Sequence, residues 1–433
     1  MSKLNEYLEN IDNNWFCTEV YTSIESRPAG TWGFCCRAKD LPYDVFNTSI
    51  AEHYNSDLMK QVRTEMLSSG SIDNKPVMQK YCETCIITEK AGLRSLRTDR
   101  SPVIKSLLPD NEILREGLVA AVDSALANDG YVDISKAGIY LIELKSYGNL
   151  CNLKCLMCDE LASSSIAAEM KKHKEIGLDG KLIQNTVHNV FEKSDKQKFF
   201  DDLRVLLPRT FSIKFTGGEP LMMPSVLEVM RFVVNEGYAK DLQMSTITNG
   251  TVINEEFIEL TKHFKTNRII FSFEGTEGLD EYMRKGTVFS EKIKNIQYIM
   301  NNVPRGVFHI NTVIQALNVG YMDDLYLFGA KHNLFVHEIV LTKPSYLSVQ
   351  VLPKAIKEMY YEKYKSFFNY KSNKIWKSFD QFNNLKTILL DDTTFTEKER
   401  LIEFEKFKEY IRRKDKQRKE NIFYVLPELK EYF

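Results

Sequence analysis

Three cysteines lie close together in the stretch CNLKCLMCD, residues 151–159. Thiolates of this kind are ligands for soft metals, but a closed zinc site or a complete iron–sulfur site takes four ligands. The group of Cys151, Cys155 and Cys158 is therefore one ligand short. Either another group completes a zinc site, or the metal is a four-iron–four-sulfur cluster with one iron open to a small chelating molecule. The third possibility, cysteines packed as small core residues, is disfavoured by the polar neighbours Asn149, Asn152 and Lys154.

Further chemically useful residues follow in four later stretches. KFTGGEP offers two glycines, which let the backbone approach a ligand closely, and a carboxylate that can accept hydrogen bonds. TITNG, IIFSFEG with DEYMRKG, and HINTVIQALN add hydroxyl, amide, carboxylate and guanidinium groups. Taken singly, each stretch is an ordinary turn or strand end. The candidate residues are Gly217, Gly218, Glu219, Pro220, Thr248, Asn249, Ser272, Glu274, Arg284 and Asn311, with Asn318 at the end of the last stretch.

All of these stretches follow apolar runs of strand length. Six such runs begin near residue 138, with helical patterns such as PSVLEVMRFVVNEG and EEFIELTKHF between them. Strands that alternate with helices predict parallel β/α units with right-handed crossovers. Polar loops at the carboxyl ends of such strands form the usual place of an active site. The six predicted strands are GIYLIELKS, FSIKFTGG, LQMSTITNG, RIIFSFEG, FHINTVIQA and FVHEIVLTK.

Spacing and order together resemble the radical S-adenosylmethionine (SAM) enzymes, whose C-x3-C-x2-C loop follows the first strand of a partial (β/α)6 barrel. GGEP, TNG and the SxDG…yR segment of that family match the loops after the later strands. Two departures are visible. Met157 stands where the family often has an aromatic residue, and Glu274 takes the place of the usual acid after its strand. The resemblance covers about residues 138–345 and implies an α/β fold.

The resemblance also implies roles. Cys151, Cys155 and Cys158 would hold a 4Fe-4S cluster whose open iron chelates SAM, and one electron would cleave SAM to methionine and a 5′-deoxyadenosyl radical that takes a hydrogen from substrate. Glu219 would accept a hydrogen bond from the methionyl ammonium. Ser272 and Arg284 would serve the ribose and the methionyl carboxylate, since an arginine fork pairs well with carboxylate. The other implied SAM contacts are Met157, Gly217, Gly218, Pro220, Thr248, Asn249, Glu274 and Asn311.

A second cysteine group lies upstream, at positions 17, 35, 36, 82 and 85. FCTEVYTSIESRPAGTWGFCC followed by KYCETC resembles the auxiliary-cluster region of the SPASM/twitch branch, in a form with the twitch domain ahead of the barrel. That resemblance implies a second 4Fe-4S cluster. We expect Cys17, Cys35, Cys82 and Cys85 as ligands, with Cys36 packed inward, although the choice between the neighbours 35 and 36 is open. Zinc is the alternative metal for this group.

Length and composition set the wider frame. The chain has 433 residues, 43% of them hydrophobic and 27% charged, with a net charge of −1, which is typical of a soluble globular protein with more than one domain. A net charge this close to zero does not indicate the strongly positive character that is usual in proteins that bind nucleic acid. We predict an auxiliary Fe-S domain over 1–102, a helical connector over 103–137, a barrel over 138–350 and a helical region over 351–433. The basic run RRKDKQRK, residues 412–419, is expected to form a solvated helix face.

No signal peptide or membrane-length apolar run is visible, so a cytoplasmic oxidoreductase is expected. Its partners would be SAM, an external flavodoxin- or ferredoxin-like electron donor, and a peptide or small-molecule substrate. Members of the SPASM/twitch branch most often modify peptides or proteins, which favours such a substrate here. The alternative substrates are a nucleotide, a nucleic acid or another small molecule. The alternative hypothesis in which the protein is not an enzyme is a binding protein with a degenerate barrel whose fold is stabilised by bound zinc.

Overall fold

A computed structural model of the protein describes residues 3–28, 30–45, 47–90, 94–145, 148–189, 191–371 and 379–433. Its centre is one eight-stranded sheet in the order β10-β9-β7-β6-β5-β3-β1-β2. The six strands predicted from apolar runs are all present, and each pairs in parallel with its neighbour in that order. The predicted α/β architecture is confirmed to this extent. Their bounds are β3 Ile139–Leu144, β5 Thr210–Phe215, β6 Gln243–Thr248, β7 Thr266–Ser272, β9 Gly306–Ile314 and β10 Phe335–Val340.

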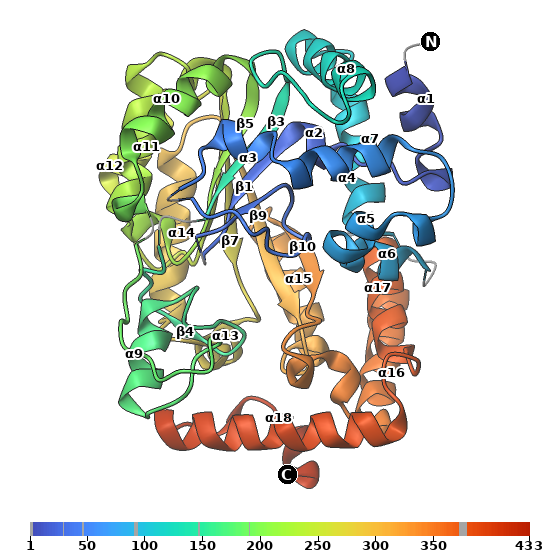
Figure 1. Ribbon diagram of the computed structural model, residues 1–433. Helices are drawn as coiled ribbons and strands as arrows, with labels where there is room; N and C mark the ends of the chain where they lie inside the picture. Colours follow the sequence, from blue (N-terminus) through green and yellow to red (C-terminus); the bar gives the residue numbers. More distant parts are fainter. Residues whose placement is uncertain are drawn as a thin grey trace.

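Side chains alternate between the two faces of these strands, as the pleat requires. On β7, Asn267, Ile269 and Phe271 are buried, whereas Arg268 and Ser272 between and after them are partly exposed. Helices cover the outer face of the sheet (Figure 1), and Asn267 of the buried set donates to the carbonyl of Thr261, in the helix before this strand, so the buried set faces these helices. The other set therefore lines the inner face. The helices between the strands are α9 Ser164–Lys172, α10 Lys196–Leu206, α11 Pro224–Asn235, α12 Glu255–Thr261, α13 Glu277–Met283, α14 Phe289–Asn302 and α15 Met322–Lys331.

The amino-terminal segment adds two strands to the same sheet. β1 (Ser23–Ser26) pairs in parallel with β3, and β2 (Trp32–Gly33) pairs with β1 in the antiparallel sense. The segment predicted as a separate domain, residues 1–102, is thus continuous with the central sheet through β1. Its boundary with the predicted connector also falls inside a helix, because α7 (Leu96–Leu107) crosses position 102.

Helices surround these two short strands. One of them is α4 (Asp57–Leu67), whose first turn is capped by the Ser56 side chain. The connector contains α8 (Glu112–Ala127), and Gly130 follows it with a φ of +81°. The remaining helices of this part are α1 Lys3–Glu9, α2 Glu19–Thr22, α3 Ile50–Tyr54, α5 Pro76–Tyr81 and α6 Glu83–Lys90.

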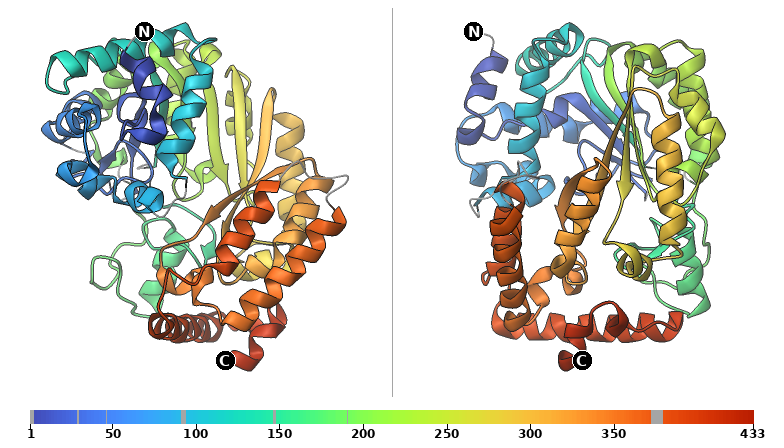
Figure 2. Two further views of the ribbon diagram at one scale, coloured as in Figure 1. Left: turned by 90° about the vertical axis from the view of Figure 1, so that its right-hand side faces the viewer. Right: turned by 180° about the vertical axis from the view of Figure 1, so that it is seen from behind.

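Within the described residues beyond 351 the regular elements are all helical. They are the α-helices α16 (Lys354–Lys371), α17 (Phe379–Leu390) and α18 (Glu397–Arg418) and two short 3-10 helices, Ile422–Tyr424 and Pro427–Tyr432. Figures 1 and 2 show α18 lying across one end of the molecule, with α9 above one of its ends and α16 above the other. Among the described residues, none of the helices is long and apolar enough to cross a membrane.

Candidate functional site

The three clustered cysteines lie on the loop between β3 and α9. Cys151 and Cys155 are buried, whereas Cys158 is exposed. Hydroxyl groups at the start of α9 fix the loop backbone, because Ser163 Oγ donates to the Leu153 carbonyl at 2.6 Å and Ser165 Oγ donates to the Cys151 carbonyl at 2.8 Å. The structure therefore places all three predicted residues on one braced loop at a strand's carboxyl end.

A two-residue ladder holds the middle of this loop. β4 (Lys154–Cys155) pairs with β8 (Arg284–Lys285), so that Cys155 stands opposite Arg284. The Cys158 thiol donates a hydrogen bond to Cys155, and this bond together with the Arg284 charge lowers the pKa of Cys155 to about 6. The same bond raises the pKa of Cys158, and burial raises that of Cys151 to about 11. Arg284 thus favours negative charge at this loop.

The GGEP loop after β5 lies directly on the cysteine loop. The Glu219 amide donates to the Leu150 carbonyl at 2.7 Å. A Cβ atom on Gly218 would lie only 2.7 Å from the Asn149 carbonyl carbon, so this position requires glycine. Gly217 adopts a φ of +128°, which favours glycine for a second reason. We expected these glycines to admit a ligand, and the structure shows that Gly218 admits the backbone of the neighbouring loop.

Glu219 joins this loop to the next strand end. Its carboxylate is fully buried and accepts hydrogen bonds from Thr248 Oγ1 at 2.7 Å and the Asn249 amide at 2.6 Å. Burial raises the pKa of Glu219, and the donors act in the opposite direction. The Asn249 side chain donates to Asn152 Oδ1 at 2.9 Å, and this hydrogen bond connects the end of β6 to the cysteine loop. The predicted residues of three consecutive strand-end loops are therefore in mutual contact.

The predicted residues after β7 form a buried ion pair. Arg284 donates to Glu274 Oε1 at 3.1 Å, and the Val313 amide donates to Glu274 Oε2 at 2.9 Å. Burial raises the pKa of Glu274 to about 8, although the Arg284 cation acts against this rise. The Nε of Arg284 is buried and has no hydrogen-bond partner among the described residues. We expected Arg284 to be free for a ligand carboxylate, whereas one of its nitrogens is held by Glu274.

Ser272 and Asn311 stand opposite each other on β7 and β9. Asn311 Oδ1 also lies 2.9 Å from His337 Nδ1 on β10. Asn318, which we placed with the fifth strand, lies beyond its end and holds the turn there, since its Nδ2 donates to the Val313 carbonyl. Met157 packs against the small buried group formed by Cys151, Leu153 and Cys155.

One buried pair beside the site has no counterpart in the sequence predictions. Lys292 of α14 and Asp280 of α13 are both fully buried, with 2.6 Å between Nζ and Oδ2. Asp280 also accepts a hydrogen bond from the Glu274 amide at 2.9 Å. The stretch EKIKNIQ around Lys292 looks like any amphipathic helix, so only the fold reveals that this lysine faces inward.

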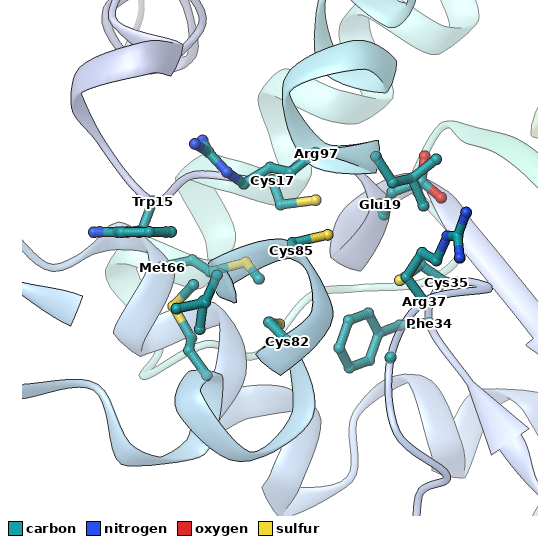
Figure 3. A pocket seen from close by; sticks show the side chains of 14 residues that line it. Trp15, Cys17, Glu19, Phe34, Cys35, Arg37, Met66, Cys82, Cys85 and Arg97 are labelled. Carbon is teal, nitrogen blue, oxygen red and sulfur yellow. The ribbon is translucent and has the colours of Figure 1, made fainter. Parts of the chain in front are cut away.

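The upstream cysteines converge on one pocket. Cys17, Cys35, Cys82 and Cys85 all line it, and Figure 3 shows their sulfur atoms around a shared space, with Trp15 and Phe34 at its sides. Burial raises the pKa of Cys82 to about 12, and it also raises those of Cys17 and Cys35 well above their ordinary value.

Cys36 does not pack inward, and that prediction is wrong. Its side chain is exposed and does not line the pocket, because the chain turns at this point and directs Cys35 and Cys36 to different sides.

In the described part of the chain, no group of three or more His, Cys, Asp or Glu side chains is placed to hold a single metal ion.

The carboxyl-terminal helix contacts the cysteine loop. The Tyr410 hydroxyl donates to the Leu156 carbonyl at 2.7 Å. Within the basic run 412–419, Lys414 and Arg418 are buried and form ion pairs with Glu169 of α9 at 3.2 and 2.9 Å. The expectation that this whole run is a solvated face is therefore wrong, because two of its cations neutralise a buried carboxylate.

Comparison with known proteins gives one family match. A family model described as the Radical SAM superfamily matches residues 146–328. "Uncharacterized protein MJ0907" of Methanocaldococcus jannaschii is 27% identical over 191 residues, which are 42% of this chain and 57% of that protein. An "AdoMet-dependent heme synthase" of Methanosarcina barkeri is 26% identical over 172 residues, which are 39% of this chain and 41% of the relative. The chain thus spans about half the length of these curated relatives.

Among solved structures, "Native anSMEcpe with bound AdoMet" aligns with a TM-score of 0.40 and 17% identity, over 55% of this chain and 63% of that one. "Crystal structure of Streptococcus suis SuiB bound to precursor peptide SuiA" aligns with a TM-score of 0.32 and 14% identity, over 72% of this chain and 64% of that one.

Proposed function

We propose that this chain, whose residues 146–328 match the radical SAM superfamily model, uses the loop of Cys151, Cys155 and Cys158 to hold a 4Fe-4S cluster that binds SAM. The observation that carries the proposal is the placement of three thiols on one braced loop, with the Arg284 cation opposite Cys155. Three thiolates fit a cluster with one open iron, since each thiolate ligates one iron. When bound, the cluster and SAM would supply an electron and a 5′-deoxyadenosyl radical that abstracts hydrogen from substrate.

The chain's own residues would prepare this loop for metal. Thiolates rather than thiols bind iron, and the Arg284 cation opposite Cys155 stabilises negative charge at this loop, which favours loading. The hydroxyl groups of Ser163 and Ser165 donate hydrogen bonds to main-chain carbonyls of the cysteine loop and so fix its backbone. These contacts order the thiols before any metal arrives, which reduces the entropy lost on binding.

We assign SAM recognition to the residues gathered around the loop. A methionyl group needs acceptors for its ammonium and a cation for its carboxylate, and the ribose needs polar partners. We assign the ammonium to Glu219 and the carboxylate to Arg284, whose Nε has no partner among the described residues. We assign the ribose to Ser272 and Asn311, which stand opposite each other on β7 and β9. The further proposed contacts are Met157, Gly217, Gly218, Pro220, Thr248, Asn249 and Glu274.

The upstream pocket would hold a second 4Fe-4S cluster on Cys17, Cys35, Cys82 and Cys85. The support is that four thiols line one largely apolar pocket, which is the number that a fully ligated cluster takes. With no open iron, such a cluster would transfer electrons and would not ligate substrate. An external donor of the flavodoxin or ferredoxin type would supply the electrons.

The preferred substrate is a peptide or protein, on the basis of the resemblance to the SPASM/twitch branch, and a nucleotide or other small molecule is the alternative.

Anaerobic reconstitution tests both clusters together. The wild-type chain should bind about eight irons and, once reduced, convert SAM to 5′-deoxyadenosine. Ala at Cys151, Cys155 or Cys158 should abolish that conversion. Cys82→Ala should lower the iron content to about four, whereas Cys36→Ala should leave it unchanged. Stoichiometric zinc without iron, or full conversion by the Cys151→Ala variant, would contradict the proposal.

A further inference from the structure

A second set of polar side chains lies on the inner face of the sheet, deeper than the strand-end loops. Ser245 on β6 stands opposite Lys214 on β5 and Arg268 on β7. One step further along the sheet, His309 follows on β9, two residues before Asn311. Arg268 shares its face with Ser272, because the two lie four residues apart on one strand, about 13 Å along it.

Most charges on this part of the sheet are paired with each other. Lys214 contacts Glu143 at 3.0 Å. Lys145 contacts Glu25 at 2.5 Å and Glu143 at 3.4 Å. These two lysines and two carboxylates neutralise one another, so they leave neither sign of charge in excess.

Arg268 differs from these neighbours. Among the described residues, its side chain forms no ion pair or hydrogen bond, and its Nε is buried without a partner. The Nδ1 of His309 is likewise buried without a partner. A half-buried guanidinium without an acceptor is costly, since a buried charge needs a counter-charge or hydrogen bonds.

The two histidines on the neighbouring strands lie within reach of the Arg268 charge. Burial lowers the pKa of His309 and of His337, and the Arg268 cation lowers both further. Lys214 acts on His337 in the same direction. Positive potential is therefore concentrated where β7, β9 and β10 run side by side (Figure 1). Phe335, which is 56% exposed, packs edge-on against His309 and gives this group an apolar border.

We propose that Arg268, flanked by His309 and His337, binds an anionic group of the substrate, either a carboxylate or a phosphate. This inference rests on the proposed function, because it assumes that substrate enters the inner face of the sheet beside the SAM residues. The guanidinium fork suits both anions, and each would give the unpaired nitrogens an acceptor. The substrate then spans about 13 Å between its anionic group and the level of Ser272.

Calorimetric titration of the reconstituted protein with inorganic phosphate, and separately with succinate, tests the site. We expect saturable binding of at least one anion and a loss of affinity of at least about tenfold in Arg268→Gln, with a smaller loss in Arg268→Lys. Arg204→Gln is the matched control, because Arg204 is exposed and paired with Glu236 on the outer surface, so its loss should change nothing. Tighter phosphate binding would indicate a phosphorylated substrate, and tighter succinate binding a carboxylate.

Labelling of arginines by phenylglyoxal gives a second measurement that needs no variant. The anion should protect Arg268 in the wild-type chain and leave Arg204 in the same digest unprotected. Absence of saturable binding of both anions, or equal affinity in Arg268→Gln and wild type, would overturn the inference. Formation of 5′-deoxyadenosine by the same preparations separates the two proposals. Cleavage without anion binding refutes the anion site alone, whereas Arg268-dependent binding without cleavage refutes the proposed function alone.

Discussion

Gly218 is the position where the smallest change should do most harm to the cysteine loop. A Cβ atom there would lie 2.7 Å from the carbonyl carbon of Asn149 and 2.8 Å from its oxygen, and closer still to the Leu150 carbonyl oxygen. All three are main-chain atoms, so they cannot rotate away as a side chain could. The Glu219 amide, bonded to the same Leu150 carbonyl, holds the two loops at this distance.

Gly218→Ala must therefore separate the two loops or break that hydrogen bond. Overpacking costs about 1–3 kcal/mol, and loss of the bond adds about 1 kcal/mol. We expect a total loss of about 2–4 kcal/mol in the free energy of unfolding, measured by urea denaturation. Because Asn149 and Leu150 lead directly into Cys151, the iron bound after reconstitution should also fall toward that of Cys151→Ala.

Gly278→Ala provides the matched control. The added Cβ would meet only Val425 Cγ1 at 3.8 Å, and the position is helical, so the change should stabilise the protein by up to about 1 kcal/mol. The reasoning would be refuted if Gly218→Ala unfolded within about 0.5 kcal/mol of wild type and kept its full iron content.

Two further predictions concern buried ion pairs. Although burial opposes it, the hydrogen bond and charge of Arg418 and the charge of Lys414 lower the pKa of Glu169 to about 2, from an ordinary 4.5. The ionised Glu169 carboxylate therefore contributes about 3 kcal/mol to the free energy of unfolding at neutral pH, and this contribution is lost as the pH falls from about 4.5 to about 2. Glu169→Gln should flatten the acid limb of a curve of stability against pH. An acid limb unchanged in this variant would contradict the account. Lys292→Met should cost about 3–5 kcal/mol in urea denaturation, because it leaves Asp280 as an uncompensated buried charge. Adding Asp280→Asn should recover more than half of that loss, and no recovery would show that the cost has another origin.

The sequence was sufficient to predict the central sheet because each long strand is an apolar run closed by polar or glycine-rich residues. IYLIEL and SIKF carry that signal locally, and the parallel order followed from the helices between them. The pairing of β1 with β3 could not be predicted in this way. β1 is only four residues long and meets a strand more than a hundred positions later, so no local pattern specifies which sheet edge it joins.

The spacing of the thiols likewise predicted where Cys151, Cys155 and Cys158 would lie, since the strand before them is unmistakable. Their supports were not predictable. The β4–β8 ladder has two residues on each strand, below the length at which any periodicity is visible. The opposite directions of Cys35 and Cys36 depend on one turn, and a sequence cannot distinguish two adjacent cysteines.

The supports of the cysteine loop share one physical character, since most of them act on its main chain. The GGEP loop bonds to the Leu150 carbonyl, β8 pairs with the backbone at Cys155, and Tyr410 donates to the Leu156 carbonyl. Carbonyl and amide groups are present whatever side chain is attached, so the residues between the cysteines can vary without loss of these contacts. The geometry of the thiols is instead sensitive to the partners, which come from three distant parts of the chain. A change far from residues 151–158 can therefore displace the cysteines, and substitutions within the loop's own side chains can leave them in place.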